Sequence, residues 1–244
     1  MRQFAAIAIL FVLSCAPGCA RPPMTNEPFA SSTIAPLANA VASDDDAEVR
    51  RQLQAGADPQ VPGSDGANLL VWAIDRGLAD SVRALLEGGA DPNHADADGK
   101  TPVHAAAFAD DPDLLRAVLD HGGDANVRNA VTGSTPLAAA MLNRNPEPVR
   151  ILLDAGADPD LADSNQDAPL HVAARTNKGA MILLLLEHGA SPLATNSGGA
   201  SFQKHYFGFR RELLNERALA ERRQVVKWLK ANNVPLEAGV EADY

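Results

Sequence analysis

A four-residue phrase recurs along the chain at nearly constant spacing, and this period constrains the fold more than any other feature. It reads Gly-Ala-Asp-Pro at 56–59, 89–92 and 156–159, with variants at 122–125 and 189–192. Successive copies therefore start 33, 33, 34 and 33 residues apart. A second phrase, Thr-Pro-Val-His-Ala-Ala at 101–106, has related copies at 135–140 and 168–173. A period of this size is typical of a solenoid, whose units pack on their neighbours.

Each unit carries the signals of two packed helices. Thr101 can cap a helix N-terminus, and Pro102 fits the first helical turn, where its missing N–H costs no hydrogen bond. Alanines at 105–107 keep this helix thin, and leucine and valine at helical spacing within 114–119 predict a second helix behind it. Gly122 suits the left-handed residue that ends the second helix.

These phrases and their spacing resemble the ankyrin repeat over residues 35 to about 236. The resemblance implies a mainly α fold, a solenoid of about six helix-turn-helix units joined by short hairpin loops. The predicted units are 35–66, 67–99, 100–133, 134–166, 167–199 and a divergent cap at 200–236, followed by an acidic tail at 237–244.

The N-terminus predicts export. Arg2 precedes an apolar run at 4–13, which is too short to cross a hydrocarbon core of about 30 Å and reads as a signal peptide. Residues 12–15 resemble a bacterial lipobox, so we expect the signal to span 1–19 with Cys15 as the lipid attachment site; cleavage after Ala20 is the alternative. Residues 20–34 predict a flexible tether. The expected location is the periplasm, either free or as an outer-membrane lipoprotein.

Composition and motifs argue against several functions. A net charge of −10 disfavours nucleic-acid binding, and the only two cysteines, Cys15 and Cys19, lie too early to cross-link the repeats. The chain has no phosphate loop, nucleophile elbow or zinc spacing, so we expect no enzyme, cofactor or metal. His104 and His171 follow the repeat, and we expect each to bond back to the start of its own helix.

A partner-binding surface follows from the family resemblance, since ankyrin proteins bind through hairpin tips and the concave side of the inner helices. Phe108 and Leu142 are the informative pair, two apolar residues adjacent in the stack at positions expected to face water. The alternative is that Phe108 tucks back between helices. The predicted partner-binding residues are Asp65, Asp75, Arg76, Asp98, Lys100, Phe108, Leu142, Asn143, Asp167 and Arg175.

One arginine per unit should form a column along the outer helices: Arg50, Arg83, Arg116 and Arg150. Each of the last three arginines has an acidic residue four positions later: Glu87, Asp120 and Asp154. We therefore expect ion pairs within and between units to neutralise the column.

The sequence thus predicts a monomeric, non-catalytic periplasmic module that binds a folded protein partner, as an immunity protein, an inhibitor or an accessory factor of an envelope enzyme. The concave side of the inner helices is expected to be acidic, which indicates a basic partner. The alternative is an envelope structural or membrane-surface protein that uses the cap, because residues 200–236 carry a net charge of +5 and five of the eleven aromatic residues. The membrane would otherwise be contacted only through the lipid anchor. An enlarged cap over the end of the stack explains the same residues without a ligand.

Overall fold

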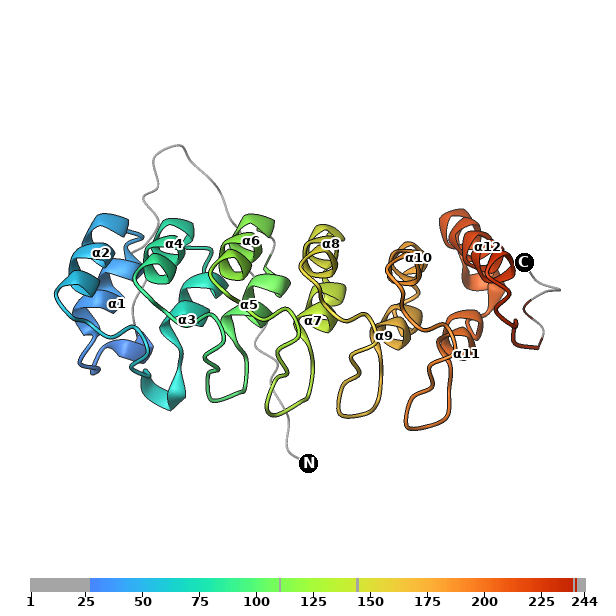
Figure 1. Ribbon diagram of the computed structural model, residues 1–244, viewed down its shortest axis with the longest axis horizontal. Helices are drawn as coiled ribbons and strands as arrows, with labels where there is room; N and C mark the ends of the chain where they lie inside the picture. The colour runs from blue at the N-terminus through green and yellow to red at the C-terminus, as the bar shows by residue number, and fades with distance from the viewer. Residues whose placement is uncertain (1–26, 110, 144, 239, 241–244) are drawn as a thin grey trace, which may run out of the picture.

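The computed structural model describes residues 27–109, 111–143, 145–238 and 240. Within these ranges the chain forms twelve α-helices in six pairs, with no strand. Figure 1 shows the pairs in a single row, with hairpin loops projecting from one side. The predicted mainly α solenoid is therefore confirmed.

Inner and outer helices alternate along the chain. The inner helices are α1 (Ala35–Ala42), α3 (Leu69–Asp75), α5 (Pro102–Phe108), α7 (Pro136–Leu142), α9 (Pro169–Arg175) and α11 (Phe202–Phe207). The outer helices are α2 (Asp46–Gln54), α4 (Ala79–Glu87), α6 (Pro112–Asp120), α8 (Glu147–Asp154), α10 (Gly179–Glu187) and α12 (Glu216–Ala231). Short 3-10 turns occur at Glu27–Phe29, Ser64–Gly66 and Arg211–Leu213.

The predicted helix signals act as expected. The Thr101 hydroxyl accepts a hydrogen bond from the His104 N–H at 3.4 Å at the start of α5, and Thr135 does the same for Ala138 at 3.2 Å. Gly122 has a φ of +89°, a left-handed conformation that ends the outer helix without the Cβ strain of other residues.

One apolar layer runs between the inner and outer helices through all six units. Ala106 and Ala107 of α5 are fully buried, as are Leu115 and Val118 of α6. The short inner side chains let α6 approach α5, and both helices contact their counterparts in the neighbouring units. A single unit would leave this face in water, so folding depends on stacking.

The N-terminal end of the stack corrects part of the predicted tether. Phe29 is fully buried, and its ring meets Trp72 edge to face with centroids 6.0 Å apart. Ile34 is also buried. Part of the segment 27–34 is therefore packed against the repeats, because Phe29 is buried against Trp72 of α3 and Ile34 is buried at the start of α1. The predicted signal and Cys15 lie outside the described residues.

The C-terminal end is closed by α12 around a buried cation. The Arg222 side chain is fully buried, with its guanidinium carbon 4.8 Å from the centre of the Tyr206 ring and 5.7 Å from that of Phe209. One of its N–H groups donates to the Asn177 side chain at 3.1 Å. The cap therefore uses part of its positive charge and aromatic surface internally.

The predicted acidic tail begins as part of this cap. The Glu237 N–H donates to the Gln203 side chain at 3.2 Å, and the Glu237 carboxylate accepts a hydrogen bond from Ser201. Val240 is buried. Both contacts hold the segment after α12 against the last unit.

Side-chain amides bridge successive hairpins at most joints between units. The Asn126 amide donates to the Gly156 carbonyl at 3.0 Å, and its oxygen accepts from the Asp158 N–H at 2.7 Å. Asn93 makes the equivalent pair of bonds one unit earlier. At the joint between units four and five the residue is Asp160, which accepts from the Ser191 N–H at 2.8 Å. A carboxylate cannot supply the second, donated bond.

The outer helices also separate at this position, which we call the 4–5 joint. The helices α8 and α10 contact each other less than any other neighbouring pair of outer helices. Figure 1 shows the open spacing between their ribbons. The 4–5 joint is therefore the most weakly packed joint in the solenoid.

Restoring the amide at the 4–5 joint should stabilise the fold. We expect Asp160→Asn to raise the free energy of unfolding by about 0.5–1.5 kcal/mol, the net value of one added hydrogen bond. The reciprocal change Asn126→Asp should lower it by a similar amount. Urea unfolding at neutral pH measures both, and equal or lower stability of the Asp160→Asn protein would contradict this account of the joint.

Candidate partner-binding surface

Phe108 and Leu142 form an exposed apolar pair at the ends of two adjoining inner helices. Phe108 is 54% exposed and Leu142 is 61% exposed. The helices α5 and α7 that carry them pack directly against each other. The structure therefore places the two side chains on one water-facing surface, and Phe108 does not tuck back between helices.

The turn after these two helices differs from that of the units on either side. Helices α3 and α9 are followed by left-handed residues, Gly77 at φ +66° and Asn177 at φ +53°. Helices α5 and α7 instead end at extended residues, Ala109 with ψ 151° and Asn143 with ψ 160°. The apolar pair therefore coincides with a distinct helix ending.

Asn143 supports the apolar pair from behind. Its side-chain amide donates to the Phe108 carbonyl at 3.0 Å and to the Ala109 carbonyl at 3.3 Å, which ties the ends of α5 and α7 together. Lys178 donates to the Asn143 carbonyl at 2.8 Å and also to the Met141 carbonyl. Burial lowers the pKa of Lys178. Asn143, predicted to meet a partner, has its amide committed within the chain.

Charges of both signs lie on the N-terminal side of the apolar pair. Asp75 and Lys100 form an ion pair at 2.7 Å across two units. The Arg76 guanidinium lies over the Trp72 ring, 4.1 Å from its centre. Asp65 and Asp98 are exposed in the hairpin loops. These predicted residues flank an apolar centre, the composition of a typical protein interface.

Asp167 and Arg175, on the C-terminal side, are bonded to each other at 2.6 Å. The Asp167 side chain is only 11% exposed and also accepts a hydrogen bond from Asn196 at 3.0 Å. Burial would raise its pKa, but these two partners lower the pKa below its ordinary value. Asp167 therefore offers little free surface, whereas Arg175 remains partly exposed.

The two repeated histidines have structural bonds, as predicted. The Nδ1 of His104 accepts from the Thr101 N–H at 3.4 Å, and its Nε2 lies 3.0 Å from the Ser134 carbonyl of the next unit. His171 makes the equivalent contacts with Ala168 and Ala200. Each ring joins its own helix start to the following hairpin. Across the described ranges no group of three acidic, histidine or cysteine residues could hold a metal.

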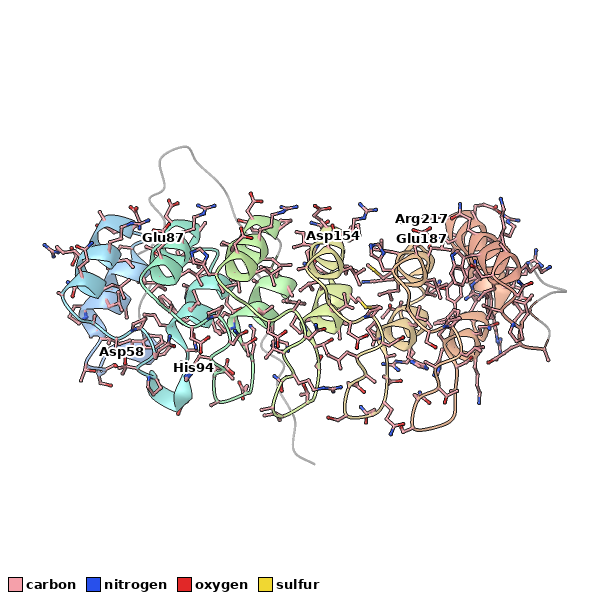
Figure 2. The ribbon with its side chains drawn as sticks, viewed as in Figure 1. Asp58, Glu87, His94, Asp154, Glu187 and Arg217 are labelled. Carbon is pink, nitrogen blue, oxygen red and sulfur yellow. The ribbon has the colours of Figure 1, made fainter. Side chains whose placement is uncertain are left out.

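The arginine column is largely neutralised, with an ion pair between units as predicted, but the pairs within helices use other carboxylates than those predicted. The first three arginines pair with carboxylates before them in the same helix, Arg50 with Asp46 at 3.6 Å, Arg83 with Asp80 at 3.2 Å and Arg116 with Asp113 at 2.9 Å. Glu87 pairs with Arg50 of the previous unit, not with Arg83. Helical side chains lean toward the N-terminus, so an arginine reaches back more readily than forward. Figure 2 shows Glu87 on the outer side of α4.

No helix in the described ranges combines the length and apolar character needed to span a membrane.

Comparison with known proteins identifies the family. A family model of ankyrin repeats in three copies matches residues 37–129 and 104–196, so the chain belongs to the ankyrin repeat family. The ankyrin repeat domain of Bcl-3, from the IkappaB protein family, is 30% identical over 79% of this chain and 85% of that chain, with a TM-score of 0.69. The ankyrin repeat protein EF0377 is 22% identical over 72% and 92%, with a TM-score of 0.66, and shows the shared fold. No curated protein matches the sequence.

The buried histidine predicts a pH-dependent stability. Burial lowers the pKa of His104 below its ordinary value of 6.5, so the unfolded chain binds a proton more readily than the folded chain. Its contribution is complete above about pH 6.5 and is lost as the pH falls toward the folded pKa. His205 shifts in the same direction, also mainly through burial.

We expect the free energy of unfolding to decrease from about pH 7.5 to about pH 5, and His104→Gln to flatten part of this decrease while lowering stability at the upper end. Urea titrations across this range, with wild type and variant side by side, measure the slopes. Parallel slopes for the two proteins would show that His104 does not titrate on unfolding.

Proposed function

We propose that this protein is a non-catalytic binding module that recognises one folded protein partner through the surface centred on Phe108 and Leu142. Binding of other proteins is the general role of the ankyrin repeat family to which the chain belongs. The observation that carries the proposal is the exposed apolar pair, held by Asn143 and flanked by charged residues. Interfaces with an apolar centre and a polar rim concentrate their binding energy in such side chains.

We place this function in the bacterial periplasm because of the apolar run at 4–13 and the lipobox-like residues before Cys15. An immunity protein, an inhibitor or an accessory factor of an envelope enzyme would each use the surface in the same way. The net charge of −10 favours a basic partner, because opposite charges accelerate association. Mass measurement of the mature protein tests the lipid, which would appear as acyl groups on Cys15.

The apolar pair can be tested directly once a partner is captured from envelope extract and identified by mass spectrometry. We expect Phe108→Asp with Leu142→Asp to weaken binding by about thirtyfold or more, the effect of losing an interface centre. Both side chains are exposed in the free protein, so the fold should survive. Titration calorimetry gives the affinities.

Leu213→Asp is a control outside the proposed surface, since Leu213 is 80% exposed in the cap region and the change introduces one of the two negative charges of the double variant. This variant should bind as the wild type does. Unchanged affinity of the double variant, with an intact circular dichroism spectrum, would refute the assignment of the surface.

A second candidate function is attachment of the cap to an anionic membrane surface. Arg223 and Lys227 are exposed one turn apart on α12, although Arg222 is buried. Vesicle flotation separates the two functions: the proposed binding module should not float with phosphatidylglycerol vesicles when it carries no lipid, and flotation that is lost at high salt would favour the membrane-surface role.

A further inference from the structure

A groove of about 530 Å³ opens on the outer side of the 4–5 joint, on the far side of the inner helices from their hairpins. It lies between α8, α10 and the start of α12. In Figure 2, Asp154 on α8 and Arg217 on α12 mark the helices on either side of α10. The volume falls in the range of sites that hold small ligands or short peptide segments.

The floor of the groove is apolar because α10 departs from the pattern of the outer helices. Leu183 occupies the repeat position that carries arginine in the first four units, and Ala180 occupies the position of Asp80 and Asp113. Met181, Leu184 and Ala180 of α10 line the groove together with Ala218 of α12. Leu184 is only half-buried, since α8 does not pack over it.

A guanidinium without a carboxylate partner stands at the edge of this floor. Arg116 binds Glu147 of the next unit at 2.7 Å, and Glu147 forms no ion pair with Arg150, three residues later. The next unit offers Ala180 where Glu147 stands one unit earlier. Arg150 is exposed, lines the groove and has no ion pair among the residues described.

Two asparagines, Asn177 and Asn215, also line the groove. Asn177 uses its side-chain oxygen to accept from Arg222, and Asn215 uses its own to accept from the Ala218 N–H at 2.9 Å. Their amide nitrogens make no hydrogen bond within the described part of the chain, and both residues line the groove. The one carboxylate of the lining, Glu221, is bound by Arg217 at 2.8 Å.

We propose that this groove binds a short peptide segment of a partner protein in which an aspartate or glutamate adjoins leucine, isoleucine or phenylalanine. The carboxylate would pair with Arg150, and the apolar side chains would cover Met181 and Leu184. The asparagine amides suit peptide carbonyls, which an acyl chain lacks. The groove does not include Phe108 or Leu142, although Asn143 and Lys178, which hold the ends of α5 and α7, also line it.

Selection of random peptides displayed on phage tests the proposal without knowledge of the partner. Peptides selected on the wild type should combine an acidic residue with large apolar ones. We expect Arg150→Glu to weaken a selected peptide by about tenfold or more, the loss of a charge-assisted contact. Ala180→Glu should also weaken it, because this change puts a carboxylate where Glu147 stands one unit earlier. Fluorescence anisotropy with the labelled peptide measures each affinity.

Two controls make the test specific. Arg223→Glu reverses an exposed charge on α12 outside the groove and should leave the affinity unchanged. Phe108→Asp with Leu142→Asp should also leave it unchanged, so the groove and the surface proposed above can fail independently. Circular dichroism confirms that each variant is folded.

Three outcomes would overturn the proposal: no peptide is enriched, the enriched peptides lack acidic residues, or Arg150→Glu binds as tightly as the wild type. Binding to phosphatidylglycerol vesicles that Arg150→Glu abolishes would assign the groove to a lipid surface and would overturn it as well.

Discussion

Contact between neighbouring units is the interaction on which the whole structure depends. Each helix pair has an apolar face that it cannot cover alone, so stability comes from the interfaces between layers. The buried alanines of α5 and leucines of α6 show how this is achieved, with small side chains inside and large ones behind. Outside the repeat pattern, Phe29 is buried against the second unit and Arg222 is buried within the last. Every surface discussed above is a consequence of how two or more layers are joined.

Polar bridges between hairpins set the register of these layers. His104 and Asn126 each bond to a backbone carbonyl of the following unit, at 3.0 Å in both cases. Because such bonds span a joint, one substitution changes the joint and leaves the units intact. Asp160 occupies the repeat position that carries asparagine in the second and third units. The weak packing of α8 against α10 occurs at the same joint. The groove therefore begins at the joint between α8 and α10 and is completed by α12 of the next unit.

The repeat and its helix ends could be predicted from the sequence because their signals are local. Thr101, Pro102 and Gly122 act on the backbone next to them. The 33-residue period shows where each unit begins. The exposure of Phe108 was predictable for the same reason, since repeat register fixes its place. Contacts between distant residues were harder. The pairing of Arg50 with Glu87, the use of Asn143 as a support and the burial of Phe29 depend on side-chain direction and on what the neighbouring unit leaves uncovered.

Lys178 connects the two surfaces. Its ammonium donates to the Met141 and Asn143 carbonyls behind the apolar pair, and its side chain also lines the outer groove. A ligand in the groove changes binding at Phe108 and Leu142 only if its affinity differs between the arrangement in which Lys178 makes these bonds and the one in which they are broken. In that case a partner bound at Phe108 and Leu142 changes the affinity of the groove by the same factor. Lys178 and Asn143 both belong to the support of the apolar pair and to the lining of the groove, and they meet at the weakest joint of the stack.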